Sequence, residues 1–255
     1  MQKIFDSHFH IIDPNFPLIE NNGFVPDYYS VDEYKEELNQ LGLKAIGGAV
    51  VSGSFQGYEQ AYFEEALKQL GDQFVGITQL HFDVTDEELQ RLHHIGIRGI
   101  RFNLYRGLSS SLEEIEELSS RCFNLLGWKT EFYVDIAKVT DELKSLILSL
   151  PATSIDHIGM TKVPAENLIG YLHHGVPIRL TGFGRVEYSR DDIKQLIREL
   201  YNANPKGLIF GTDLPSTRAA YRFSGLDIEL IQEVLNEEEC ENVFWKNGLE
   251  WYLGD

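Results

Sequence analysis

The chain has 255 residues, a formal net charge of −18, 43% hydrophobic residues and 24% charged residues, a composition typical of a soluble globular protein and unlike that of a disordered one. The strong negative charge repels phosphate backbones and anionic lipids, so we expect neither nucleic acid nor a membrane surface as a partner. No apolar run approaches the ~18 residues that span a bilayer, and the N-terminus shows no signal-peptide pattern, which predicts a cytoplasmic protein.

Short β-rich runs alternate regularly with longer helical patterns along the chain. Such alternation predicts parallel strands joined by crossover helices. There are eight runs of each kind, and the length is close to the roughly 250 residues of a (β/α)8 barrel. The sequence therefore predicts an α/β fold, a TIM barrel, formed as a single domain over residues 1–255. The predicted strands lie near residues 3–12, 45–52, 74–82, 97–104, 130–136, 153–158, 176–182 and 207–213.

Helix boundary signals support this division. Three hydroxyl side chains precede helical patterns and are followed three residues later by an acidic residue, as in N-terminal caps, and three glycines end such patterns. An open doubly wound sheet is the alternative, but it would usually carry a glycine-rich phosphate turn after an early strand, and none follows the first strand. The cap pairs are Ser30 with Glu33, Thr85 with Glu88 and Ser189 with Asp192, and the terminating glycines are Gly42, Gly71 and Gly96.

The first strand, within FDSHFHIIDP, carries two histidines one residue apart. Because side chains alternate along a strand, His8 and His10 point to the same side, with Asp6 one step behind them. The dipeptide DP then ends the strand and places both imidazoles at its C-terminal end, which is the catalytic end of a parallel barrel. The pair could hold a metal or a carbonyl group. The loop that follows, residues 13–29, is expected to form part of a lid over the mouth.

Three further polar residues stand at predicted strand ends. A lone histidine in such a place is more often a hydrogen-bonded structural group, and we assign that role to His81. His157 ends the sixth strand in the motif IDHIG. The run LIFGTDLPS puts Asp213 directly after the eighth strand, where its carboxylate could ligate a metal or take a proton from water. An aspartate there could equally be a cap or turn residue.

Five arginines gather around strand ends in a chain that has only 22 Lys and Arg. Such a cluster predicts a clamp that binds a carboxylated substrate by bidentate pairing. The alternative for any one arginine is a surface salt bridge with the abundant Asp and Glu, and we assign it to Arg98, Arg190 and Arg222. In the cluster, Arg101 and Arg106 flank the end of strand 4, Arg179 and Arg185 flank strand 7, and Arg218 follows strand 8.

Motifs at the predicted strands occur in a fixed order. The chain carries HxHxxDP on strand 1, RGIRFN on strand 4, EFYVD on strand 5, IDHIG on strand 6, IRLTGFGR on strand 7 and GTDLP on strand 8, with a closing ENVFWKNGLEWY. This order resembles the amidohydrolase superfamily over essentially the whole chain. The strand 4, 6 and 7 motifs are most similar to the amidohydrolase-related group that contains 2-pyrone-4,6-dicarboxylate lactonase and similar sugar-lactone hydrolases.

The resemblance implies hydrolysis of a lactone or related ester on a (β/α)8 barrel. It implies that His8, His10 and His157 polarise the substrate carbonyl, directly or through a metal. Asp213 would be the general base that directs water onto the acyl carbon. The implied substrate-binding residues are Arg101, Arg106, Tyr133, Arg179 and Arg185, of which Arg179 stands where the group commonly has lysine.

Departures from the superfamily pattern bear on the metal. Binuclear members have lysine or glutamate at the end of strand 4, and residues 97–106 contain neither, so a two-metal centre is not expected. Mononuclear members usually add a histidine from strand 5, and WKTEFYVDIAK has none. One divalent ion would have His8, His10 and Asp213 as core ligands and His157 as a candidate fourth, a donor set that suits Zn²⁺ first and Mn²⁺ second. The group also includes metal-free enzymes, so metal-free operation stays open.

We therefore expect a hydrolase that opens a small carboxylated lactone or related ester by water attack at the mouth of the barrel. A metal-dependent decarboxylase on the same barrel is the alternative, and the missing strand 5 histidine counts against it. A catalytically silent barrel that binds a carboxylated ligand is a third reading, which the intact histidine pair and Asp213 disfavour. The expected partner is the small-molecule substrate, and both a monomer and a homo-oligomer are compatible with the sequence.

Overall fold

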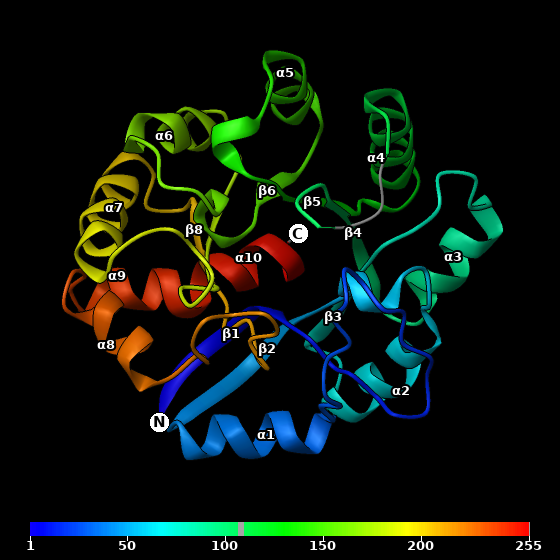
Figure 1. Cartoon of the computed structure of the whole chain (residues 1–255), viewed down its shortest axis with the longest axis horizontal. Coiled ribbons are helices and arrows are strands. Elements are labelled where there is room, and N and C mark those ends of the chain that lie inside the picture. Colours follow the sequence, from blue (N-terminus) through cyan, green and yellow to red (C-terminus); the bar gives the residue numbers. More distant parts are fainter. Residues whose placement is uncertain (107–109, 255) are drawn as a thin grey trace.

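The computed structural model describes residues 1–106 and 110–254. Eight parallel strands follow one another in chain order around a barrel, and helices surround them (Figure 1). The predicted α/β class and the TIM-barrel topology are confirmed. The strands are β1 (Gln2–Phe9), β2 (Leu43–Val51), β3 (Phe74–Thr78), β4 (Ile97–Asn103), β5 (Lys129–Tyr133), β6 (Thr153–Ile155), β7 (Ile178–Leu180) and β8 (Leu208–Phe210).

A helix follows each strand, and two more helices come after the one that follows β8. Helices and strands thus alternate as the sequence predicts until the last strand. The helices are α1 (Val31–Gln40), α2 (Ala61–Leu70), α3 (Asp86–His94), α4 (Leu112–Leu126), α5 (Asp141–Ser149), α6 (Ala165–His173), α7 (Arg190–Ala203), α8 (Gly225–Gln232), α9 (Glu237–Glu241) and α10 (Asn247–Leu253).

The predicted helix boundaries are found in the structure. Ser30 and Ser189 each form a reciprocal capping box with the acidic residue three positions on, and the Thr85 hydroxyl accepts from the backbone N–H of Glu88. The terminating glycines have φ values that side chains rarely adopt, 69° at Gly42, 99° at Gly71 and 108° at Gly96.

The last three strands are shorter than predicted, and two residues of the site therefore lie beyond the strand ends. β6 stops at Ile155 because His157 and Ile158 have left-handed φ values of 49° and 43°, which end the extended backbone. Asp213, with a φ of 59°, lies three residues beyond the end of β8. His157 and Asp213 therefore stand on turns at the mouth of the barrel, not within strands.

The first and last strands meet at a seam that closes the barrel. The backbone N–H of Asp213 donates to the His8 carbonyl at 2.7 Å, and the N–H of His10 donates to the Leu214 carbonyl at 2.7 Å. The Ser7 hydroxyl donates to the Phe210 carbonyl at 2.5 Å. The seam thus places the histidine pair of β1 directly beside the turn that carries Asp213.

Helix α10 covers the opposite end of the barrel and lies across the ring of strands in Figure 1. Its Tyr252 stacks on Phe5 of β1, with ring centroids 5.7 Å apart, and its hydroxyl contacts Glu131 and Arg179. Apolar side chains of strands and helices pack into a continuous core around the sheet. None of the described helices is long and apolar enough to cross a membrane.

Candidate active site

His8 of β1 and His10, the residue just after its end, both point into the mouth of the barrel and are buried there. Their rings meet edge to face, with centroids 5.2 Å apart. His10 Nδ1 lies 2.7 Å from the carbonyl oxygen of Val51. Because a carbonyl can only accept, Nδ1 of His10 carries the hydrogen. If the ring is neutral, its Nε2 presents a lone pair toward the turn after β8.

Asp213 faces the Nε2 atom of His10 on one side and a guanidinium group on the other. Its Oδ1 lies 3.5 Å from His10 Nε2 and 3.7 Å from His8 Nε2, and its Oδ2 lies 2.6 Å from Arg185 Nη2. Burial raises the pKa of the Asp213 carboxyl, but the Arg185 guanidinium together with His157 and His10 outweighs burial and holds that pKa well below its ordinary value. Asp213 is therefore ionised at neutral pH although it is almost fully buried.

Asp6 does not share the face of the histidine pair, contrary to the strand pattern. The pairing of β1 with β2 shifts register on both sides of Asp6, which breaks the simple alternation. Its carboxylate accepts from the backbone N–H and hydroxyl of Thr212, at 2.8 and 2.7 Å, and from the Tyr34 hydroxyl at 3.0 Å. Asp6 thus ties β1 to the residue before Asp213, and burial raises the pKa of Asp6 to about 6.

His157 joins the cluster from the turn after β6. Its ring lies edge to face with those of His8 and Tyr133, at centroid distances of 4.8 and 5.0 Å. Burial lowers the pKa of His157 to about 3 and that of His8 well below its ordinary value, so both rings are neutral at pH 7. In the described part of the chain, neither ring has a hydrogen-bond partner for either nitrogen.

The donor atoms of this cluster fit a metal ion. His8, His10 and Asp213 offer ligand atoms that all lie within 4.8 Å of one another. A lone pair of neutral His10 facing a carboxylate oxygen is repulsive unless a cation or a proton lies between them. His8, Asp156 and His157 form a second such group, but Asp156 already pairs with Arg101 and Arg179. The first group is therefore the better candidate, and His157 lies beside it.

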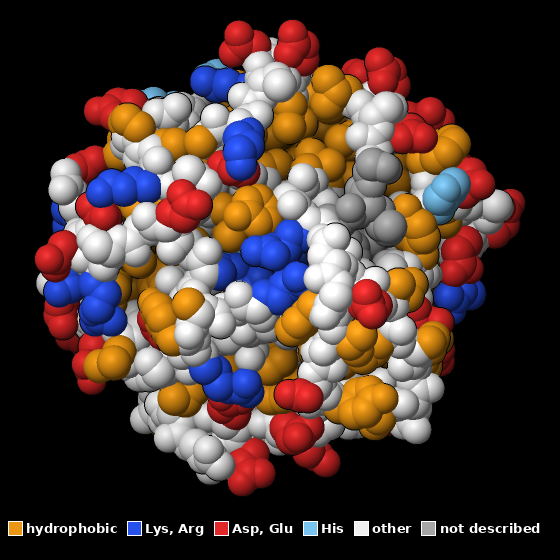
Figure 2. Space-filling view, in the orientation of Figure 1, with side chains coloured by type: hydrophobic (Ala, Val, Ile, Leu, Met, Phe, Trp, Pro, Cys, Tyr) orange, Lys and Arg blue, Asp and Glu red, His pale blue; other side chains and the backbone are white. Residues whose placement is uncertain are grey.

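Three of the predicted substrate arginines reach the same small cavity. It has a volume of about 20 Å³, so side chains almost fill it. Basic side chains, drawn in blue for Lys and Arg, gather at the centre of the face shown in Figure 2. Sequence analysis placed Arg218 in the arginine cluster without naming it as a substrate residue, and it did not identify Asn103. The lining includes His10, Arg101, Asn103, Arg106, Tyr133, Arg185 and Arg218.

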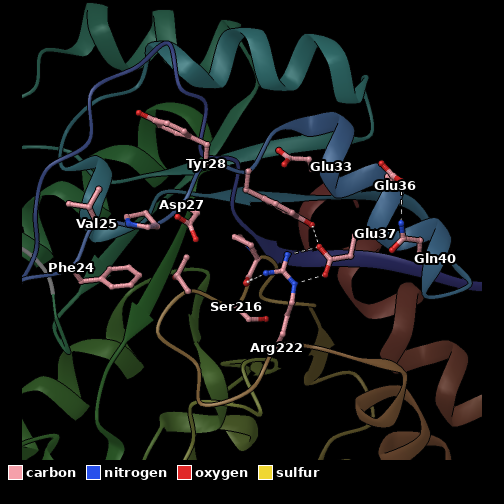
Figure 3. Close-up of a pocket in the computed structure, with 14 residues that line it drawn as sticks. Phe24, Val25, Asp27, Tyr28, Glu33, Glu36, Glu37, Gln40, Ser216 and Arg222 are labelled. Atoms are coloured by element: carbon pink, nitrogen blue, oxygen red, sulfur yellow. Dashed lines mark hydrogen bonds and ion pairs between the residues drawn. The ribbon is translucent and has the colours of Figure 1, made fainter.

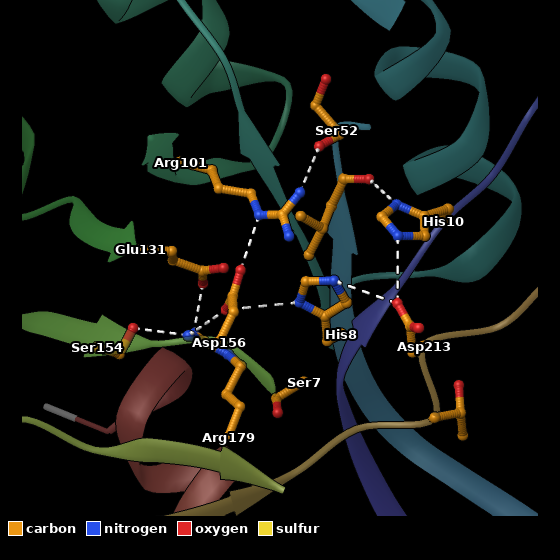
Figure 4. A network of polar contacts seen from close by, with 12 residues as sticks. Ser7, His8, His10, Ser52, Arg101, Glu131, Ser154, Asp156, Arg179 and Asp213 are labelled. Atoms are coloured by element: carbon orange, nitrogen blue, oxygen red, sulfur yellow. Dashed lines mark hydrogen bonds and ion pairs between the residues drawn. The ribbon is translucent and has the colours of Figure 1, made fainter. Parts of the chain in front are cut away.

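Arg179 does not line this cavity, contrary to the prediction that it binds substrate. Its side chain is fully buried and pairs with Glu131 at 2.5 Å and with Asp156 at 3.1 Å (Figure 4). It also donates to the Ser154 hydroxyl at 2.7 Å and contacts the Tyr252 hydroxyl. Arg179 therefore lies within the barrel, where protein groups take up its hydrogen-bonding capacity.

The loop of residues 13–29 lies against the mouth. The Asn21 side chain donates to the Arg106 carbonyl at 3.1 Å and accepts from Arg218 at 3.0 Å, and the Ile19 N–H donates to the Phe55 carbonyl at 2.7 Å. The Arg218 guanidinium also lies over the Phe24 ring, 4.4 Å from its centroid. The loop thus covers one side of the arginine cluster, as a lid would.

A larger groove of about 590 Å³ lies beside the mouth, between this loop, α1 and the segment after β8 (Figure 3). Arg222 forms two hydrogen bonds to Glu37 there, at 2.6 and 2.7 Å, which confirms its predicted salt bridge. Arg98 and Arg190 instead donate to backbone carbonyls. His81 is exposed and pairs with Asp83. No histidine is found among the described residues that line the groove.

Comparison with known proteins agrees with this site. The family model described as Amidohydrolase matches residues 5–253. The chain belongs to the amidohydrolase family. This amidohydrolase is 27% identical over 235 residues to 2-pyrone-4,6-dicarboxylate hydrolase of Comamonas testosteroni, which covers 82% of this chain and 76% of that protein. It is 25% identical over 233 residues to 4-sulfomuconolactone hydrolase of Rhizobium radiobacter, covering 83% of this chain and 75% of that protein.

Solved structures share the fold of this amidohydrolase. A probable 2-pyrone-4,6-dicarboxylic acid hydrolase of Acinetobacter baumannii, solved with citric acid bound, superposes with a TM-score of 0.82. The two chains are 22% identical, and the match covers 98% of each. At this identity the likeness establishes the barrel architecture alone.

Proposed function

We propose that this amidohydrolase opens a small carboxylated lactone, or cleaves a related ester, by water attack at the mouth of the barrel. The observation that carries the proposal is the ionised carboxylate of Asp213 facing two buried histidines beside a cluster of arginines. The matched relatives support it, because their names describe hydrolases of a pyrone dicarboxylate and of a sulfonated muconolactone.

Asp213 supplies the base in this reaction. Its carboxylate takes a proton from water as the water oxygen attacks the acyl carbon, and the carbonyl oxygen becomes an oxyanion. The imidazoles of His8, His10 and His157 lie where they can stabilise that oxyanion. When the ring C–O bond breaks, the leaving oxygen takes the proton held by Asp213 and becomes a hydroxyl group, and the carboxylic acid that forms releases its proton to the medium.

One divalent metal, zinc first and manganese second, is part of the proposal. His8, His10 and Asp213 would hold it, and His157 is the candidate fourth ligand. When bound, such an ion would polarise the substrate carbonyl. His8 and His157, whose ring nitrogens have no hydrogen-bond partner in the described structure, can serve the same end through their own N–H groups, which is why metal-free operation is tested directly below.

The arginines select an anionic substrate. In the described residues Arg106 and Arg218 form no ion pair, whereas Arg101 and Arg185 pair with Asp156 and Asp213. A carboxylate on the substrate would compensate the positive charge at the rim by charge-assisted hydrogen bonds. Tyr133 is buried beside them, and no hydrogen-bond partner for its hydroxyl is found in the described structure, so it is proposed to contact the substrate.

The proposal is tested by metal analysis of the purified protein together with assays on carboxylated lactones, including 2-pyrone-4,6-dicarboxylate. Ring opening with proton release is expected, and release of CO₂ in its place would contradict the proposal. About one zinc or manganese ion per chain, lost with activity on chelation, supports the mononuclear site. Full activity without metal would assign carbonyl polarisation to the histidines alone.

A further inference from the structure

A buried carboxylate beside the cavity contacts both halves of the site. Asp156, next to His157 in the chain, is fully buried. Its Oδ2 accepts a hydrogen bond from Arg101 Nε at 2.8 Å, and its Oδ1 lies 3.7 Å from His8 Nδ1. Figure 4 shows Asp156 between these two side chains. One carboxyl group thus touches a residue proposed to bind substrate and a residue proposed to polarise its carbonyl.

Asp156 is itself held from behind. Arg179 Nη1 donates to its Oδ1 at 3.1 Å, and Arg179 is fixed in turn by Glu131 at 2.5 Å and by the Tyr252 hydroxyl. The network contains two guanidinium groups and two carboxylates, so its formal charge is balanced without water. Because both oxygens of Asp156 are engaged by arginines, its carboxylate has a fixed direction toward His8 and Arg101.

We propose that Asp156 is a positioning residue that fixes the Arg101 guanidinium for substrate binding and the His8 ring for carbonyl polarisation at the same time. This role rests on the proposed function for its catalytic consequence, but not for the contacts themselves. Arg179, Glu131 and Tyr252 then serve as the support that keeps the Asp156 carboxylate in place. This accounts for an arginine within the barrel that does not reach the substrate cavity.

The contacts are tested by nuclear magnetic resonance without any ligand. In the wild-type protein the Arg101 Nε–H signal should exchange with water more slowly than that of Arg106, whose Nε has no hydrogen-bond partner in the described structure. In Asp156→Asn, which keeps the shape and removes the charge, Arg101 exchange should accelerate and the His8 ring signals should shift. Asp83→Asn, which removes an exposed carboxylate outside this network, is the matched control and should leave both unchanged.

The catalytic consequence is tested by a double-mutant cycle on a lactone that turns over. Asp156→Asn should lower kcat/KM by about 10- to 100-fold, the usual cost of removing an outer carboxylate partner of a metal-ligating histidine. Arg101→Met should act mainly on KM. If Asp156 also positions His8, Asp156→Asn should still lower kcat in the Arg101→Met background.

Two results would overturn the inference. One is fast exchange of Arg101 Nε–H in the wild-type protein, which decides the matter even if Asp156→Asn does not fold. The other is an effect of Asp156→Asn that vanishes in the Arg101→Met background, since Asp156 would then act through Arg101 alone. If no lactone is opened, the proposed function fails, while the signals of Arg101 and His8 still decide the positioning role.

Discussion

Asp213 meets two demands with a single carboxyl group. Its Oδ1 faces both histidines of β1, and its Oδ2 is held by Arg185 at 2.6 Å. The arginine offsets the cost of burying the charge, and it leaves the first oxygen directed at the histidines, where substrate and water would lie. Under the proposed mechanism, Arg185 would tune the base as well as bind substrate.

Removing the charge of Asp213 should stop the reaction and leave the fold intact. Asp213→Asn is expected to lower kcat by roughly 10²- to 10⁴-fold, the usual contribution of a general base, because the amide cannot accept a proton. Asp83→Asn, at an exposed acidic residue paired with His81, is the matched control. Steady-state kinetics and circular dichroism measure the two effects, and unchanged kcat in Asp213→Asn would refute the assignment of the base.

The pH dependence should report the contact between Arg185 and Asp213. The pKa of Asp213 lies well below its ordinary value, so the base stays ionised as pH falls, and kcat/KM of the wild type should remain level from pH 8 to about pH 5. In Arg185→Met the largest of the contacts that oppose burial is lost, so the pKa of Asp213 rises and activity should decline on the acid side. A pH–rate profile of both proteins is the measurement, and identical profiles would contradict the coupling.

At the scale of elements, the seam between β1 and β8 holds Asp213 beside the histidine pair. Gly211, just after β8, lies so close to β1 that an added Cβ would come within 2.8 Å of the His8 nitrogen and 2.9 Å of the His8 Cβ. No side chain fits there unless β1 moves. The close approach of the two backbones is what brings Asp213 to the histidine pair.

We therefore expect Gly211→Ala to lower activity by more than its loss of stability alone would explain. The methyl group must push β1 away at His8, at a cost of about 1–3 kcal/mol in the free energy of unfolding, and it shifts the histidines relative to Asp213. Gly170→Ala is the matched control, because an added Cβ meets nothing within 4 Å in helix α6, and it should stabilise the protein by up to about 1 kcal/mol. Urea denaturation and kcat/KM are the measurements; equal activity of the two variants would argue against a tight seam.

The sequence was informative at the element scale for a physical reason. Alternating strand and helix patterns and local cap residues such as Ser30 and Ser189 depend on neighbours in the chain, so eight strands and their order could be predicted. The ends of β6 and β8 could not, because the left-handed turns at His157 and Asp213 arise from packing at the mouth.

The residue types of the site could be predicted, but the depth at which each residue lies within the barrel could not. His8 and His10 were singled out from their spacing, and His157 and Asp213 from their strand-end positions and the family resemblance; the four do meet in the structure. The position of Arg179 could not be read in this way, because its partners Glu131 and Asp156 come from other strands. Periodicity tells which side of a strand a residue faces, and the depth at which it lies within a barrel depends on how the strands are staggered.

On the scale of the whole molecule, strands and helices pack into a large core around the barrel, and a smaller apolar cluster joins β1, β2 and β3 to Tyr252 of α10. The barrel is closed by contacts between its first and last strands, so no part of the sheet is complete without the rest. This arrangement suggests that residues 1–255 act as one cooperative unit. Because contacts join the first and last strands, we expect neither half of the barrel to fold alone.

Thermal unfolding should accordingly show a single transition. Differential scanning calorimetry is expected to give one peak whose calorimetric and van't Hoff enthalpies agree, because all elements share the core. Two resolved transitions, or a fragment of residues 1–126 that folds alone, would contradict the prediction of a single domain.

The seam also has a consequence for the synthesis of the protein. Asp6 and Thr212, which lock the seam, are separated by 206 residues in the chain. A ribosome makes the histidine pair at the start of translation and Asp213 only after all eight strands have been made. The nascent chain therefore carries no assembled base and imidazole pair while it is being made. Premature termination before β8 would yield a polypeptide with its histidines but without the carboxylate that the proposed chemistry requires.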